Sequence, residues 1–255
     1  METTELLQAL FRWIHIFAGI VWIGHLYFFN FVNAPFEASI PDIKGKVIPE
    51  LRPRALYWFR WGAAWTWVTG VLLVLLVFYH GKQMGFAEGG WSIGAIVMAL
   101  LTFLAFGIYD PVAKSIKDNK QMAAVGFGLT AVVVLAYVYV GGFGYRAYVI
   151  HTGALFGTLM AANVWMRIWP AQQKIITAIK AGQPPDAALV GLAGTRSRHN
   201  TYMSVPLVWT MINQHTLAAA PASAIGGVIY LLVAVALGWG AVLLCYKKSA
   251  QIKGF

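Results

Sequence analysis

The sequence predicts an all-α integral membrane protein of about seven transmembrane helices. Three observations support this prediction. Of the 255 residues, 59% are hydrophobic and only 11% are Asp, Glu, Lys or Arg, against about 25% in a typical soluble domain. The apolar residues fall into runs of about 20, the length that spans the hydrocarbon core as a helix. The 11 Trp and 11 Tyr residues suit the membrane–water interface, where amphipathic rings concentrate.

The apolar runs set the order of the predicted helices, because a chain that crosses lipid must satisfy its backbone hydrogen bonds internally. The predicted spans cover roughly residues 6–33, 56–80, 91–110, 121–141, 145–169, 200–218 and 223–246. The longest connection, at about 170–199, contains a helix-like stretch to Lys180 and a turn at 182–185. We therefore expect one transmembrane domain, residues 1–255, with a cytoplasmic loop that carries a short surface helix.

Every second connection between the predicted spans is rich in positively charged residues. Lys and Arg gather between spans one and two, three and four, and five and six, and in the C-terminal tail, whereas the other connections contain Lys82 alone. The positive-inside rule then places the N-terminus outside and the C-terminus in the cytoplasm, and an odd number of spans agrees. Topology thus accounts for the net charge of +10, and we expect a lipid bilayer and no nucleic acid as a partner.

Three histidines are the main candidate ligands of a cofactor, because ionisable groups inside spans are costly and often mark a functional site. At about 1.5 Å per residue, His15 in span one and His151 in span five lie about a dozen ångströms below the outer surface. His215 lies near the outer end of span six. Haem b is commonly held by histidines on facing helices. We therefore expect haem b, with His15 and His151 as the axial pair and His215 as the alternative ligand.

Two arginines extend this candidate cofactor site. Arg12 precedes His15 by one helical turn on the same face, and Arg146 lies just outside His151. Either guanidinium could pair with a haem propionate or with an anionic substrate. An ordinary hydrogen bond to a neighbouring helix would also explain any one of these histidines.

The remaining histidines are predicted to lie away from this outer candidate site. His25 and His199 fall in the inner half and could hold a second haem, although ten residues of helix turn His25 about 80° away from His15. His80 suits the interface at the end of span two, and His199 also suits the start of a cytoplasmic helix. We therefore expect one haem b, with a second, inner haem as the alternative.

The sequence lacks the motifs of several other functional classes. Cys245 is the single cysteine, so the chain has no Cys-x-x-Cys-His for a c-type haem. It also has no phosphate-binding loop, no dinucleotide fingerprint and no His-Glu-x-x-His. Acids are rare within the spans, which argues against ion-coupled transport. An inventory of histidine, arginine and aromatic residues favours electron transfer.

Several sequence blocks resemble one known family. They are RWIH at 12–15 with AGIVWIG at 18–24, HTGA at 151–154 with MAANV at 160–164, IKAG at 179–182 with PD at 185–186, and RHNTY at 198–202 with NQH at 213–215. Together they are similar to the N-terminal membrane domain of bacterial membrane-bound urate oxidase (urate hydroxylase), over nearly the whole chain. The first-helix block is also similar to other haem-binding membrane families, including a membrane protoporphyrinogen oxidase.

The resemblance implies a multi-pass protein of the bacterial inner membrane. The family positions that carry over are His15, His151, His199 and His215, whereas His25 falls where a small residue is expected. The family also implies a following c-type cytochrome domain that accepts electrons from urate oxidation. The sequence ends at Phe255 without that domain, so we expect a separate cytochrome c or a larger redox complex as the partner.

The predicted function is therefore a membrane b-haem oxidoreductase or electron-transfer module that is urate-oxidase-like. Two alternatives stay open. One is a non-catalytic membrane subunit of a respiratory or photosynthetic complex, which predicts co-purification with a large assembly. The other is a transporter of a purine-like solute, which predicts flux into vesicles without redox change.

Overall fold

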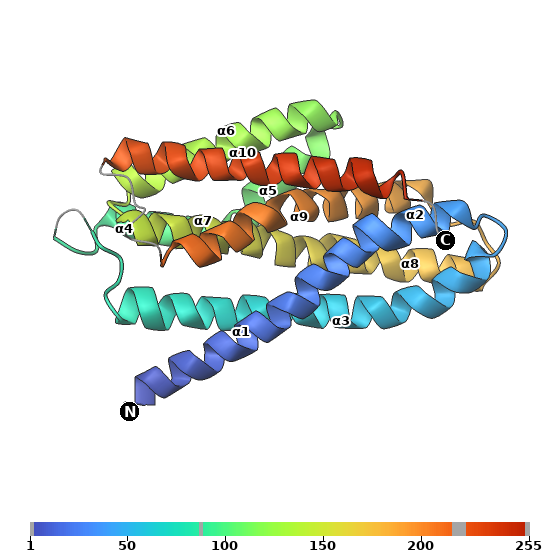
Figure 1. Ribbon diagram of the computed structural model, residues 1–255, viewed down its shortest axis with the longest axis horizontal. Helices are drawn as coiled ribbons and strands as arrows, with labels where there is room; N and C mark the ends of the chain where they lie inside the picture. Colours follow the sequence, from blue (N-terminus) through green and yellow to red (C-terminus); the bar gives the residue numbers. More distant parts are fainter. Residues whose placement is uncertain (1–2, 87–88, 216–222, 253–255) are drawn as a thin grey trace. The chain divides into compact units, whose positions relative to one another are not determined.

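The computed structural model describes residues 3–86, 89–215 and 223–252, and within these ranges it contains helices and no strand (Figure 1). The all-α class is thereby confirmed. In chain order the elements are α1 (Thr3–Tyr27), η1 (Phe28–Asn33), α2 (Ala34–Ser39), α3 (Lys44–Leu73), η2 (Val74–His80), α4 (Ile93–Leu104), α5 (Phe106–Ser115), α6 (Asn119–Tyr139), α7 (Tyr145–Asn163), η3 (Val164–Ile168), α8 (Trp169–Lys180), α9 (Ala187–Asn213) and α10 (Ala224–Ser249).

Among the described residues, five continuous helical stretches are long and apolar enough to cross a membrane. They are Thr3–Ser39, Lys44–His80, Asn119–Tyr139, Tyr145–Lys180 and Ala224–Ser249. A sixth span arises if α4 and α5, which meet at a bend of 52°, count as one. The chain is therefore a multi-pass membrane protein. The predicted span at 200–218 falls partly in α9 and partly outside the described residues, so the count of seven and the orientation stay predictions.

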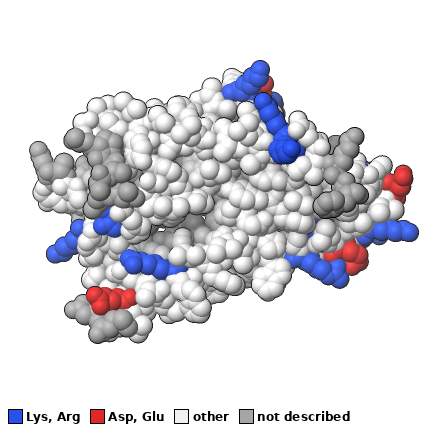
Figure 2. Space-filling view, viewed as in Figure 1, with Lys and Arg blue, Asp and Glu red and all other residues white. Residues whose placement is uncertain are grey.

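The surface agrees with a lipid environment. On the face shown in Figure 2, few Lys, Arg, Asp or Glu side chains interrupt an otherwise uncharged surface. Large apolar side chains are exposed along α1, where Trp13, Phe17 and Ile20 are 73%, 66% and 68% exposed. In water such a surface would drive aggregation, whereas in a bilayer it contacts lipid tails.

The structure is more helical between residues 170 and 199 than the sequence analysis expects. The helix through α7 and η3 continues into α8, and α9 begins at Ala187. Pro170 lies where η3 gives way to α8, and this change of hydrogen-bond pattern accommodates a residue without an N–H. Gly182, with φ of 70°, provides the left-handed turn that ends α8. The connection between the two long helices is thereby reduced to residues 181–186.

Three helices continue through π-helical segments, η1 after α1, η2 after α3 and η3 after α7. Such segments are rare and often occur at functional sites. In η1, Asn30 uses its side-chain amide to donate to the carbonyl of Leu26 at 2.8 Å. Tyr79 lies in η2.

The residues group into two compact units. Unit 1 comprises Met1–Leu72, Met160–Ser204 and Trp239–Phe255, and unit 2 comprises Leu73–Leu159 and Val205–Gly238.

Unit 1 is joined by close helix packing and by buried amides. A Cβ atom at Gly62 of α3 would lie 3.0 Å from the backbone nitrogen of Trp22 in α1, so glycine permits this approach. Asn30 of η1 donates to Ser197 of α9 at 2.9 Å and accepts from the hydroxyl of Tyr246 in α10 at 2.8 Å. One amide thus connects three helices.

Unit 2 has a core of aliphatic and aromatic side chains. It includes Phe78, Met98, Val134, Tyr137, Phe143, Val149 and Leu231, all at most 4% exposed. Its helices also approach closely at Gly227, where a Cβ atom would overlap the hydroxyl of Tyr148. His151 lies within this core.

Candidate functional site

His15, on α1, is held by the backbone of a second helix in unit 1. Its Nδ1 atom lies 2.9 Å from the carbonyl oxygen of Thr66 in α3. Because a carbonyl only accepts, Nδ1 must carry the proton, and the lone pair is left on Nε2. The hydroxyl of Thr69 lies 3.3 Å from the same nitrogen. No described residue hydrogen-bonds Nε2, so this atom is available as a ligand.

The sequence of α3 explains how this ring fits. Thr66 and Thr69 send their hydroxyl protons back to the carbonyls of Gly62 and Trp65, at 2.7 and 2.6 Å. Thus the carbonyl of Thr66 is the acceptor that meets His15. A Cβ atom at Gly70 would lie 2.9 Å from Cε1 of His15, so glycine leaves room for the imidazole. These residues are not among the candidates predicted from the sequence, although small polar side chains in an apolar run are a visible signal.

His151, on α7 in unit 2, has both ring nitrogens engaged and is 0% exposed. Nδ1 lies 2.7 Å from the carbonyl oxygen of Ala147, one turn earlier, so it is the donor. Nε2 therefore carries the lone pair and accepts from the hydroxyl of Tyr79 at 3.0 Å. Coordination of a metal by Nε2 would require Tyr79 to release this hydrogen bond.

Aromatic rings surround His151. Phe143 lies 4.8 Å from it between ring centroids, the stacked ring of Tyr79 lies at 5.7 Å, Tyr137 at 5.8 Å and Phe78 at 6.3 Å. Tyr137 is held in turn by a hydrogen bond of 2.7 Å between its hydroxyl and that of Thr102. This packing fills the space around the imidazole in the described conformation, and none of these aromatic residues is among the candidates predicted from the sequence.

Arg146 and His215 lie close to one another in unit 2. Arg146 donates through Nε to the carbonyl of Gln214 at 3.0 Å and through a terminal nitrogen to the side chain of Gln83 at 2.9 Å. His215 follows Gln214 and is exposed, with its Nε2 atom 2.9 Å from the Gln214 amide nitrogen. Arg146 therefore joins α7 to the end of α9.

The other candidates divide between the units. Arg12 is exposed and reaches Gln8 at 3.4 Å. His25 donates to the carbonyl of Val21 at 2.7 Å on its own helix. His199 is partly buried on α9, and His80 is exposed at the end of η2.

The predicted axial pair draws one histidine from each unit, because His15 belongs to unit 1 and His151 to unit 2. Their pairing therefore stays a prediction. Within the described ranges, no group of three or more His, Cys, Asp or Glu could hold a metal ion. Haem iron needs only one or two protein ligands.

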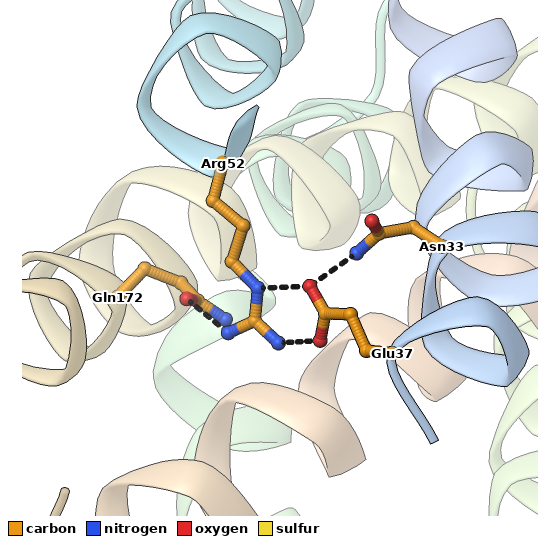
Figure 3. Close-up of polar contacts among 4 residues, drawn as sticks. All are labelled: Asn33, Glu37, Arg52 and Gln172. Atoms are coloured by element: carbon orange, nitrogen blue, oxygen red, sulfur yellow. Dashed lines mark hydrogen bonds and ion pairs between the residues drawn. The ribbon is translucent and has the colours of Figure 1, made fainter. Parts of the chain in front are cut away.

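Two acidic side chains, Glu37 and Asp110, are buried, and each is paired with a basic side chain. Glu37 of α2 is bound by the guanidinium of Arg52, accepts from Asn33 at 2.9 Å, and lies in a cluster that also includes Gln172 (Figure 3). Asp110 of α5 forms an ion pair of 2.7 Å with a lysine one turn later. Because each acid already neutralises a cation, its first role is to join or stabilise helices.

Comparison with known protein families finds a match. The model of the family described as urate oxidase N-terminal matches residues 42–248, which is more than half of the chain. His151, His199 and His215 fall within the matched range, and His15 precedes it. No curated protein and no solved structure matches the chain.

Proposed function

Because the chain belongs to the urate oxidase N-terminal family, we propose that it is a membrane oxidoreductase module that binds haem b through His15. It passes electrons to a separate cytochrome c or to a larger redox complex. The observation that supports this proposal is the imidazole of His15, whose Nδ1 donates to the Thr66 carbonyl and whose Nε2 has no partner among the described residues.

The residues around His15 fit an axial ligand. Histidines that bind metals usually donate their second ring N–H to a carbonyl or carboxylate, which fixes the tautomer and orients the ring. The Thr66 carbonyl supplies that acceptor, and Gly70 leaves space for the ring. When bound, the haem supplies one-electron transfer. The chain itself holds the imidazole, orients it and keeps its Nε2 lone pair free.

Whether a second histidine would hold the haem depends on Tyr79 in this proposal. His151 serves as the second ligand only when Tyr79 gives up its hydrogen bond to Nε2. His215 is the alternative ligand, and Arg146 and Arg12 are the candidate partners of haem propionates or of an anionic substrate. A haem held by two histidines would suit electron relay, whereas a haem held by one histidine would remain open to a small ligand.

A reduced-minus-oxidised spectrum of the purified protein, expressed with haem supplied, tests the haem proposal. We expect a b-type band in the wild type and its loss in His15→Ala. His80→Ala is the control, because His80 is exposed at the end of η2 and is not among the candidate haem ligands. A wild type without the band, or His15→Ala with full haem occupancy, would refute the proposal.

Urate is the substrate to test first. The assay measures urate consumption and the reduction of added cytochrome c by the haem-loaded protein. Turnover in both readouts supports an oxidoreductase. Haem binding without turnover, together with co-purification of a large assembly, would favour a non-catalytic subunit, and urate flux into vesicles without redox change would favour a transporter.

A further inference from the structure

Arg60 of α3 is a cation whose N–H groups have no acceptor among the described residues. Its Nε atom is buried without a hydrogen-bond partner, and none of the described ion pairs includes it. The guanidinium instead lies against aromatic rings, 3.8 Å from the ring centre of Trp169, 5.8 Å from that of Tyr57 and 6.0 Å from that of Trp165.

Arg52, eight residues earlier on the same helix, is an arginine whose N–H groups find acceptors within the protein. Its guanidinium binds both oxygens of Glu37 and donates to Gln172 of α8 at 3.2 Å (Figure 3). Arg60 also faces this side of the chain, because the indole of Trp165 donates to its carbonyl at 3.1 Å. Two arginines against the η3–α8 segment therefore differ in one respect, the supply of acceptors.

The aromatic rings around Arg60 cannot replace those acceptors. A ring face attracts the flat face of a guanidinium, but its five N–H donors point outward in the guanidinium plane. Leaving charged donors without acceptors at the edge of a membrane is costly. An acceptor of opposite charge from outside the chain would remove that cost.

The surroundings of Arg60 correspond to the membrane–water interface. The charged residue of α3 that precedes Arg60 is Arg54, about 9 Å earlier along the helix. Tyr57, Trp58 and Trp61 next to it are 49%, 57% and 41% exposed. Exposed Trp and Tyr of this kind mark the level of lipid headgroups.

We propose that Arg60 binds the phosphate of an anionic phospholipid. The guanidinium edge donates to the phosphate oxygens as a planar fork, while Trp169 and its neighbours hold the guanidinium face. A zwitterionic lipid such as phosphatidylcholine binds less well. Its choline would repel Arg60, and the rings that could attract a choline already contact the guanidinium.

Native mass spectrometry of the purified full-length protein in detergent tests this site without involving haem. The probes are dioleoylphosphatidylglycerol and dioleoylphosphatidylcholine, titrated separately. We expect the wild type to prefer the anionic lipid, and Arg60→Gln to bind that lipid about tenfold more weakly, the loss expected for a charge-assisted hydrogen bond. Arg54→Gln is the control, because Arg54 is exposed on the same helix and pairs with Glu50.

A second variant and a competitor complete the design. Arg60→Lys keeps the charge but loses the fork and the stacking, so its affinity should lie between those of wild type and Arg60→Gln; it decides the result if Arg60→Gln does not give a monodisperse, helical protein. Unchanged lipid binding in Arg60→Gln, an equal loss in Arg54→Gln or equal binding of both lipids would overturn the proposal. Displacement of the lipid by inorganic phosphate would overturn it in favour of a free-anion site.

Discussion

His15 and His151 differ in the one property that decides whether a histidine can bind a metal. Both donate through Nδ1 to a backbone carbonyl, His15 to Thr66 of another helix and His151 to Ala147 of its own. The Nε2 lone pair of His15 has no partner among the described residues, whereas that of His151 accepts from Tyr79. The more deeply buried histidine is thus the less available ligand. Availability follows from the neighbouring donor and not from burial within the protein.

Among the substitutions that test this difference between His15 and His151, Gly70→Leu is expected to have the largest effect. The new side chain would begin 2.9 Å from Cε1 of His15 and force the ring away from the Thr66 carbonyl. We expect a loss of about 3 kcal/mol in stability, as for an overpacked site, and loss of any haem bound through His15. Denaturation in detergent and the haem spectrum measure both effects. Gly24→Leu is the control, because nothing lies within 4 Å of a Cβ atom there; equal effects of the two changes would contradict the role given to Gly70.

An intermediate effect is expected from Tyr79→Phe, which would make the two histidines alike. The change removes the donor and leaves the buried Nε2 of His151 unsatisfied, which costs about 2 kcal/mol. Tyr139→Phe, at a position that is 64% exposed, should change stability little. In the haem-loaded protein, Tyr79→Phe also tests whether His151 would bind the haem, because a shift of the spectrum toward low spin would indicate binding by a second histidine. A spectrum identical to that of the wild type would argue against His151 as a ligand.

The smallest effect is expected from Thr69→Val, which separates the two contacts of His15. The Thr69 hydroxyl lies 3.3 Å from Nδ1, further than the Thr66 carbonyl, and already donates to Trp65. We expect a stability change of about 0.5–1 kcal/mol and unchanged haem content. Loss of haem in this variant would mean that the hydroxyl, and not the carbonyl, orients the ring.

The sequence predicted the helical class because a long apolar run leaves few alternatives in lipid. It did not predict the helical extent of residues 170–199, because Pro170 and the polar stretch before Asn200 suggest a break or a surface. In the structure, Asn200 is 0% exposed and donates to the carbonyl of Met160 at 2.9 Å. An asparagine looks the same in the sequence whether its amide is buried or exposed, so only the packing of the folded chain distinguishes the two cases.

For the candidate site, the sequence could select histidines by depth but could not identify their partners. His15 finds its acceptor 51 residues away, and His151 finds its donor 72 residues away. Both partners lie on other helices far away in the sequence, so no local pattern reveals them. For Arg60, the rings of Trp165 and Trp169 that cover its face also come from a distant segment.

The π-helical pitch of η2 has a consequence for His151. Tyr79 is the sixth of the seven residues in η2, so the accumulated difference between π and α geometry, roughly 100° or one residue's rotation, sets where its hydroxyl points. If η2 tightened to α-helical hydrogen bonding, the phenol would turn away from the imidazole. The Nε2 lone pair of His151, which now accepts from Tyr79, would then become free. The change would be one of register within a single helix, and His151 itself would not move.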